Sequence, residues 1–280
     1  MIAGMAMAKM DVYQAVGALA REVQQRIIER LEFRGRDPVF VAMREAYFDK
    51  LELAGAARVL DLGCGTGVVT RALARRADFA GEITGSDLSD VLIAAADRFA
   101  AEEELSEAIA FEVGDCHALD HGDESFDRVV THTLISHVVD PAALITEAAR
   151  VTKPGGLIVI FDGDYASMTF GAGEADANGA IVEGILDAVV AHPHVMRELP
   201  GLLKDQGLEL VHFKPELLAE AGTGGFFLGL AEAYVPMAVK ARTIPDSVGP
   251  GWLASQRAAL DEGRFFAACN YYSYIARKPA

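Results

Sequence analysis

The middle of the chain alternates short apolar runs with segments of helical spacing. The run Val59-Leu60-Asp61-Leu62 suits a buried strand, and after it Val69, Ala72 and Leu73 recur as on one face of a helix. Further strands are predicted over 82–87, 108–113, 125–133 and 157–161, with helices over 91–100 and after Asp140. This alternation predicts an α/β fold built on a parallel sheet.

Two helices are predicted before this core. The first has apolar residues every three or four positions and is expected to end at Gly35; its apolar positions are Val12, Val16, Leu19, Val23, Ile27 and Leu31. The second begins with Asp37 as its N-cap and Pro38 in its first turn. Two interpretations stay open: the helices only pack on the sheet edge, or the first also covers a ligand site, with Tyr13 as a lid residue.

After the fifth strand the pattern predicts helices over 178–190 and 199–206, followed by a strand from Gly207 to Phe213. About forty residues then precede an aromatic-rich last strand over 265–276, and they contain apolar helices over 226–241 and 252–260. We interpret 222–261 as a cap over an acceptor pocket; a dimerisation surface is the alternative. The chain divides into a helical extension (1–56), a core (57–165) and a C-terminal part with the cap (166–280).

Composition narrows the function classes. With 280 residues, 51% of them hydrophobic, the chain can bury a large core, and no apolar run reaches the roughly 18 residues of a membrane span. The first ten residues lack a signal-peptide layout, so a cytoplasmic location is expected. A net charge of −16 disfavours nucleic acid as a partner. The cysteines, Cys64, Cys116 and Cys269, lie too far apart in the sequence for a C-x-x-C pair, so no metal site is expected.

The glycine run Gly63-Cys64-Gly65-Thr66-Gly67 follows the first predicted strand and opens a helix. Open α/β sheets bind ligands at the carboxyl ends of their strands, and glycines let the backbone approach a ligand closely. A dinucleotide fingerprint needs a third glycine where this chain has Val68, and a phosphate-binding loop needs Gly-Lys-Ser/Thr where it has Gly67-Val68-Val69. The run therefore indicates a nucleoside-type cofactor of another kind.

Asp87 ends the second predicted strand, twenty residues beyond Gly67. An acid there can accept hydrogen bonds from both hydroxyls of a ribose. Its alternative role is the N-cap of the next helix, which Ser89 could also fill.

Together these motifs resemble motif I and the later strands of the class I S-adenosylmethionine (SAM)-dependent methyltransferases. The resemblance rests on Leu60-Asp61-Leu62 before G-x-G-x-G, on Phe126-Asp127-x-Val-Val, and on Lys153-Pro154-Gly155-Gly156. The last segment is similar to one in ubiquinone and menaquinone biosynthesis methyltransferases. The resemblance implies a Rossmann-like, doubly wound, seven-stranded sheet with an antiparallel last strand, SAM as cofactor and S-adenosylhomocysteine (SAH) as product.

The same resemblance assigns cofactor contacts. The glycine turn is implied to lie against the amino acid part of SAM, Asp87 at the ribose and Asp115 at the adenine amino group, with Cys116 beside the ring. Asp115 could instead be an ordinary turn residue after Gly114. The full set of expected cofactor residues is Asp61, Gly63, Cys64, Gly65, Gly67, Asp87, Leu88, Asp115, Cys116 and Thr131.

Candidate catalytic residues lie at or just after the ends of the fourth and fifth strands. A sulfonium methyl group needs an in-line nucleophile, and a histidine can serve as base near neutral pH. His132 and His137 are the candidates for that base, while Asp162 and Asp164 could orient an amine or hydroxyl. The alternatives are that His137 only packs or caps a helix and that Asp162 only holds a loop.

The acceptor pocket is expected to be apolar or aromatic. Its predicted lining is Tyr13, Tyr165, Met168, Phe170, Phe226, Phe227 and Tyr234. We therefore predict methyl transfer to an O, N, S or C atom of a small molecule, in quinone or secondary metabolism, by a chain that could form a homodimer. The alternatives are a SAM-binding regulatory or scaffold protein without transfer, and a nicotinamide dehydrogenase, which Val68 disfavours.

Overall fold

The N-terminal helices differ from their prediction at two points. The computed structural model describes residues 11–55 and 58–280, beginning with the 3₁₀ helix η1 (Val12–Ala18) and continuing with α1 (Arg21–Arg36), α2 (Pro38–Phe48) and η2 (Leu53–Gly55). The single helix predicted from Val12 to Leu31 breaks, because Leu19 and Ala20 are extended. Asp37 caps α2 as predicted, accepting a hydrogen bond from Val39 N–H at 2.8 Å.

Gly35 lies inside α1 instead of ending it, so the predicted stop was wrong. The reason for glycine here is space, since a Cβ at this position would clash with both methyl carbons of Val68. Gly35 therefore lets α1 cross closely over the start of α3 (Val68–Ala74).

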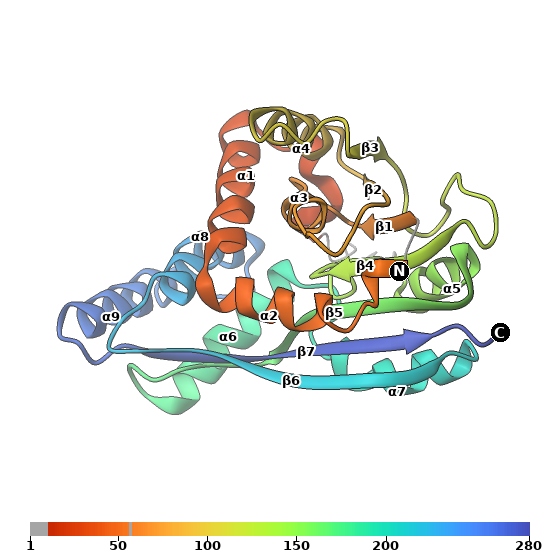
Figure 1. The fold of residues 1–280 in the computed structure, drawn as a ribbon. Coiled ribbons are helices and arrows are strands. Elements are labelled where there is room, and N and C mark those ends of the chain that lie inside the picture. Colours follow the sequence, from red (N-terminus) through yellow and green to blue (C-terminus); the bar gives the residue numbers. More distant parts are fainter. Residues whose placement is uncertain (1–10, 56–57) are drawn as a thin grey trace, which may run out of the picture.

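The described residues form one seven-stranded sheet, which confirms the predicted fold class (Figure 1). The strand order is β3-β2-β1-β4-β5-β7-β6; the first five strands are parallel, and β7 is antiparallel to both of its neighbours. The strands are β1 (Arg58–Leu62), β2 (Glu82–Asp87), β3 (Ile109–Val113), β4 (Phe126–His132), β5 (Thr152–Phe170), β6 (Glu209–Ala221) and β7 (Phe266–Arg277). β6 continues eight residues beyond the predicted end at Phe213, because it pairs with β7 as far as Ala221.

Helices cover both faces of the sheet and enclose two cores. On one face, α2, α3, α6 (Ala175–Val189), α8 (Phe226–Ala241) and α9 (Gly249–Asp261) pack over alternate strand residues such as Val59, Val159 and Phe161. On the other, α5 (Pro141–Val151) and α7 (Val195–Asp205) pack over Leu60, Ile158 and their neighbours. Since side chains alternate across a strand, buried residues of one strand serve both cores.

The predicted cap is part of the larger core. Phe226, Phe227 and Trp252 are all buried there, and α8 packs against both α6 and α9. Figure 1 shows α8 between α1 and α6, with α9 beyond α8 at the end of the long β6–β7 pair. The cap therefore contributes to the same core as the sheet. The division of the chain into three parts stays a prediction from the sequence.

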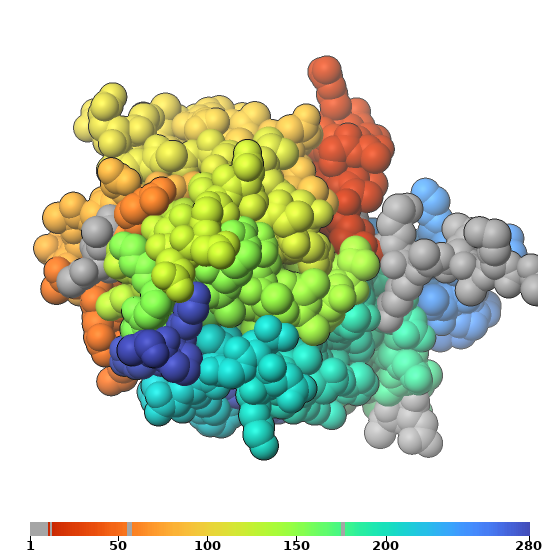
Figure 2. Space-filling view, turned by 90° about the vertical axis from the view of Figure 1, so that its right-hand side faces the viewer, coloured from red at the N-terminus to blue at the C-terminus, as the bar shows by residue number. Residues whose placement is uncertain are grey.

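A smaller cluster joins the N-terminal segment to the sheet layer. η1 and α1 bury Val16, Ile27 and Ile28 against Leu92 and Ala95 of α4 (Asp90–Glu102). At the other end of the chain, Lys278 exchanges backbone hydrogen bonds with Gly155 and Gly156 in the turn at the start of β5, which places the C-terminal end (dark blue in Figure 2) against that turn. Among the described helices, none is long and apolar enough to cross a membrane.

Candidate functional site

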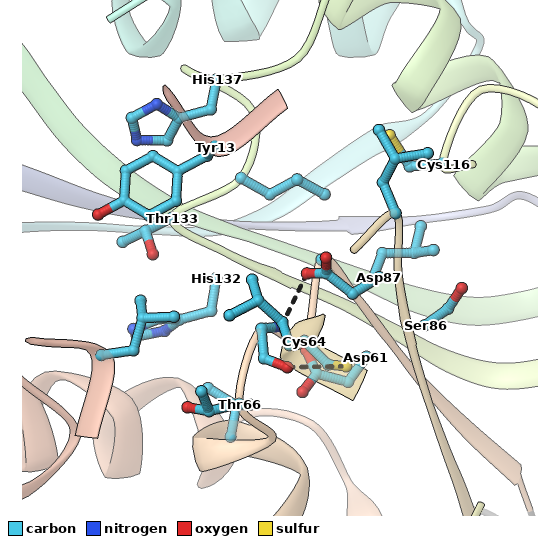
Figure 3. Close-up of a pocket in the computed structure, with 18 of the residues that line it drawn as sticks. Tyr13, Asp61, Cys64, Thr66, Ser86, Asp87, Cys116, His132, Thr133 and His137 are labelled. Carbon is cyan, nitrogen blue, oxygen red and sulfur yellow. Dashed lines mark hydrogen bonds between the residues drawn. The ribbon is translucent and has the colours of Figure 1, made fainter. Parts of the chain in front are cut away.

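A cavity of about 330 Å³ lies at the carboxyl ends of β1, β2 and β4, where the sequence predicted the ligand site. The loops after β1 and β2 line one side, and α1, η1 and the segment after β4 line the other. Figure 3 shows this division, with Asp61, Cys64, Asp87 and Cys116 lying apart from Tyr13 and His137.

The glycine turn is held by hydrogen bonds within the protein. Gly63 and Cys64 both donate their backbone N–H to the Ser86 carbonyl, at 2.8 and 3.0 Å, and Gly65 N–H donates to Asp87 Oδ2 at 2.9 Å. These N–H groups therefore hold the turn to β2. Gly63 and Gly65 have φ of +67° and +56°, in the left-handed region that glycine adopts most readily, and both line the cavity.

Gly67 has a packing role. It lies away from the cavity lining and precedes α3 with φ +76°, and a Cβ there would lie 2.7 Å from Cζ of Phe111. The structure gives Gly67 a role in close packing of helix on strand, and its expected contact with the cofactor stays a prediction.

Two buried oxygens in this cavity have no hydrogen-bond partner in the described part of the chain. Asp61 accepts a bond from Thr70 Oγ1 at 2.6 Å through Oδ2, but its Oδ1 is unpaired, as is Ser86 Oγ. Burial raises the pKa of Asp61 to about 7. Unpaired buried polar atoms are costly, so both oxygens suit a ligand that carries hydrogen-bond donors.

Asp87 lines the cavity and does not cap α4. Its two oxygens accept bonds from Gly65 N–H and Ser89 N–H, each at 2.9 Å, while Ser89 itself caps the helix. A carboxylate has about four acceptor positions, so Asp87 can still accept bonds from two ligand hydroxyls. Leu88, also in the lining, is 56% exposed at the mouth.

Asp115 and Cys116 line the far end of the cavity together with His117, which the sequence reasoning did not select. Asp115 accepts bonds from the His117 backbone N–H at 2.9 Å and from the ring at 2.8 Å, and these bonds lower the pKa of Asp115. The ligand atoms of the three residues lie within 4.8 Å of one another, a grouping that could hold a metal ion and that the sequence did not predict.

Thr131 points away from the cavity, so its expected role does not fit. Its hydroxyl donates to the Val159 carbonyl at 3.3 Å and the residue is 1% exposed. His132 and Thr133 line the cavity instead. Thr133 has φ +54°, unusual for a β-branched residue, and its Oγ1 accepts a bond from Arg34 at 2.7 Å.

His132 is held by a tyrosine that sequence reasoning missed. Its Nδ1 lies 2.9 Å from the Tyr47 hydroxyl, and its ring stacks on Phe161 with centroids 4.6 Å apart. Burial, and then the charges of Arg34 and Arg44, lower the pKa of His132 well below its usual value. Its imidazole is therefore neutral at neutral pH.

His137 is paired with Asp11, 126 positions away in the chain. Asp11 Oδ2 lies 2.7 Å from His137 Nδ1 and also accepts a bond from Ala191 N–H at 3.2 Å. Burial lowers the pKa of His137, but the charge and hydrogen bond of Asp11 outweigh it, so the net shift is upward. With Nδ1–H donating to Asp11, the lone pair of Nε2 is available, in the arrangement of a general base with an orienting carboxylate.

The acids of β5 lie away from the cavity, which corrects their expected contact with substrate. Asp162 is fully buried and accepts bonds from Ser136 N–H and Oγ, at 3.1 and 2.9 Å. Asp164 forms a two-oxygen ion pair with Nε of Arg197, at 3.0 and 2.9 Å. Asp162 therefore holds the loop at Ser136, next to His137, which is the role that the alternative interpretation gave it. Its charge also raises the pKa of His137.

A second, much smaller cavity of about 20 Å³ adjoins the first, and the two share Tyr13, Arg34 and His137 in their linings. Of the predicted acceptor-pocket residues, this cavity is lined by Tyr13, Tyr165, Met168, Phe226 and Tyr234. Phe170 and Phe227 are core residues instead: Phe170 packs on Trp252 with ring centroids 5.0 Å apart, and Phe227 is fully buried.

Comparison with known proteins gives one family. Residues 60–160 match the model described as a methyltransferase domain. An uncharacterized 37.1 kDa protein of transposon Tn4556 from Streptomyces fradiae is 30% identical over 84% of this chain and 66% of its own length. The ubiquinone/menaquinone biosynthesis C-methyltransferase UbiE of Geotalea daltonii is 30% identical over 52% of this chain and 63% of its own length.

Among solved structures, the [4+2]-cyclase SpnF has the same fold. It aligns with a TM-score of 0.62 and 22% identity, covering 97% of each chain. The matches to the two curated relatives span somewhat less than two thirds of those proteins.

Proposed function

The chain belongs to the class I SAM-dependent methyltransferases, and on that premise we propose that it methylates a hydroxyl oxygen of a small molecule. SAM is the cofactor of this family and SAH its product. The proposed contacts follow the cavity lining. The unpaired Oδ1 of Asp61 suits the ammonium of SAM, Asp87 and Ser86 suit the ribose hydroxyls, and Asp115 with Cys116 suits the adenine.

The single observation that carries the proposed acceptor class is the Asp11–His137 pair between the two cavities. When bound, SAM supplies an electrophilic methyl group. His137 accepts the hydroxyl proton of the acceptor at Nε2 as the oxygen attacks, and Asp11 stabilises the imidazolium that forms. The surrounding phenol and apolar side chains exclude water, which favours methyl transfer to the acceptor.

A base is chemically required for a hydroxyl acceptor. Hydroxyl groups are weakly acidic and poor nucleophiles at neutral pH, whereas a thiol is more easily ionised. His132 contributes differently: its lowered pKa keeps it uncharged in the lining of the main cavity, so it adds no further positive charge beside the sulfonium.

The test is a screen of hydroxylated small molecules with SAM, detecting SAH and locating the new methyl group by mass spectrometry and NMR. We expect a methyl ether, and His137→Gln should lower kcat roughly 10²- to 10⁴-fold with little change in SAM affinity. His194→Gln is a matched control, because His194 is exposed and lies outside both cavity linings.

Two outcomes would contradict the proposal. Methylation at nitrogen, sulfur or carbon would refute the hydroxyl acceptor while leaving methyl transfer intact. Tight SAM binding without SAH formation from hydroxyl, amine or thiol acceptors would favour the alternative of a SAM-binding protein without transfer. The homodimer and the cytoplasmic location stay predictions from the sequence.

A further inference from the structure

Two arginines of α1 face the second cavity from one side of the helix. Arg30 and Arg34 are four residues apart, so they are neighbours on the helix surface, and both line this cavity. Arg34 also lines the main cavity, where its Nη2 donates to Thr133 Oγ1. Arg30 lies over the Tyr234 ring, with Cζ 4.3 Å from the centroid.

Both arginines are half-buried, and they lack the carboxylate partners that such cations usually have. Across the described residues, neither has a carboxylate within 4 Å, and Nη1 of Arg30 is buried without any hydrogen-bond partner. Residues 1–10 contain no aspartate or glutamate. By contrast, the buried Arg71 pairs with Glu32 at 2.8 Å and with Glu103 at 2.9 Å.

A guanidinium that is withdrawn from water without a carboxylate or hydrogen-bond partner costs free energy, unless a bound ligand supplies that partner. Burial lowers the pKa of Arg30, but four nearby phenols (Tyr234, Tyr13, Tyr165 and Tyr271) outweigh it and give a net rise. Arg30 therefore stays charged at neutral pH, with phenol groups around it and, among residues 11–55 and 58–280, no carboxylate within 4 Å to neutralise it.

We propose that Arg30, assisted by Arg34, binds a carboxylate of the methyl acceptor, so that the substrate class is a small hydroxylated carboxylic acid. The guanidinium fork matches a carboxylate with two parallel hydrogen bonds. His137 lies at the junction of the two cavities, so an acceptor anchored at Arg30 presents its hydroxyl toward the general base. Met168, Phe226 and Leu230 supply apolar contact for the body of the acid.

The second cavity must widen to admit such an acid, because about 20 Å³ holds little more than one water molecule. The Tyr13 and Tyr234 hydroxyls, 3.2 Å apart, close it between η1 and α8. A bound carboxylate replaces that contact and gives both hydroxyls a charged acceptor.

The carboxylate of SAM has a different candidate partner. Arg44 lines the main cavity and lies outside the lining of the second; its Nε lies 3.5 Å from Oε1 of Glu45 and makes no hydrogen bond within the described chain. Arg30 lines only the second cavity. Substitution of Arg30 is therefore expected to change acceptor recognition and leave SAM affinity unchanged.

The experiment measures binding to the SAH-loaded protein, so it does not depend on turnover. A panel of aryl carboxylates, including benzoate, salicylate and 4-hydroxybenzoate, is titrated by calorimetry alongside the corresponding neutral amides. We expect at least one acid to bind at least tenfold more tightly than its amide. Arg30→Met should remove this preference, Arg30→Lys should retain part of it, and the SAH affinity of both should equal that of the wild type.

Arg26→Met is the matched control, since Arg26 lies one turn earlier on α1 and is exposed. It should keep the full preference for acids. Equal affinity for acids and amides across the panel, or no binding of either, overturns the proposal, as does a preference that survives in Arg30→Met. The proposal rests on the proposed function, but the two fail separately. Acid-selective binding without methyl transfer would refute only the transfer, and turnover confined to neutral alcohols would refute only the carboxylate site.

Discussion

Replacing Asp11 with asparagine is the sharpest test of the proposed base. Asp11 is 1% exposed, and its Oδ2 lies 2.7 Å from His137 Nδ1, so the substitution removes a buried charge without removing side-chain volume. The asparagine amide can donate to Nδ1, which puts the imidazole proton on Nε2 and blocks proton acceptance there. We expect kcat to fall roughly 10²- to 10⁴-fold, the range for loss of general base catalysis.

The same substitution has a signature that needs no acceptor. Because the net pKa shift of His137 in the folded protein is upward, the pair stabilises the fold fully below pH ~6.5, and this contribution is lost as pH rises through the raised folded value. Asp11→Asn should therefore lower the free energy of unfolding by about 1–3 kcal/mol at pH 6 and by less at pH 9. Urea unfolding at both pH values measures the difference.

Tautomer-sensitive NMR of the imidazole nitrogens provides the direct check. In the wild type the neutral ring should carry its proton on Nδ1, and in Asp11→Asn on Nε2. A control is needed because Asp11 also caps η1, accepting a bond from Tyr13 N–H at 2.9 Å. Asp11→Ser keeps a capping group but no charge, so it should behave as Asp11→Asn in turnover. Unchanged turnover and the same tautomer in both variants would refute the reasoning.

Three further predictions concern the cofactor side. Asp87→Asn should weaken SAM binding at least tenfold, about 1.4 kcal/mol, because an amide has only one acceptor oxygen to serve both the ribose and the glycine turn. Calorimetry measures the SAM affinity, and an unchanged value would remove Asp87 from the ribose site. SAM affinity should rise from pH 5.5 to 7 as Asp61, with its pKa near 7, ionises opposite the cofactor ammonium, and Asp61→Asn should flatten that profile. Gly67→Ala should destabilise the fold by about 2 kcal/mol or more, because its φ of +76° and the Phe111 ring 2.7 Å from the new Cβ both oppose it. Gly201→Ala in α7, with nothing within 4 Å, should not destabilise; equal loss in both variants would contradict this account.

Local signals carried the prediction of the cofactor domain. The strand β1, its glycine turn and α3 are contiguous in sequence, so their hydrophobic periods and glycine positions were enough to place Gly63, Gly65 and Asp87 at one sheet edge. The same reasoning did not fit Thr131, because this residue still lies within β4 and its hydroxyl bonds to the neighbouring strand β5, whereas His132 at the end of β4 and Thr133 after it line the cavity.

The helices near the site were predicted less well because tertiary contacts decide their bounds. Apolar spacing continues through Leu19 to Leu31, yet the helix breaks before Arg21. The preceding helix η1 is held instead by two hydrogen bonds to His137, one between Asp11 and the imidazole ring and one from the Gln14 side chain to the His137 carbonyl. Likewise β6 extends as far as β7 offers it partners. Periodicity reports which face is buried, but it does not report what the face is buried against.

The sequence by itself determined the sheet, its nucleoside-binding edge and the cofactor class, because these depend on residues close together in the chain. The proposed base and the proposed anion site depended on the tertiary structure. Asp11 meets His137 across 126 positions, and Tyr47 meets His132 across 85. Arg30 looks like one of several polar residues on an amphipathic helix until the fold places it over Tyr234. A side chain's charge state and partner are properties of its surroundings, and only the folded chain brings those surroundings together.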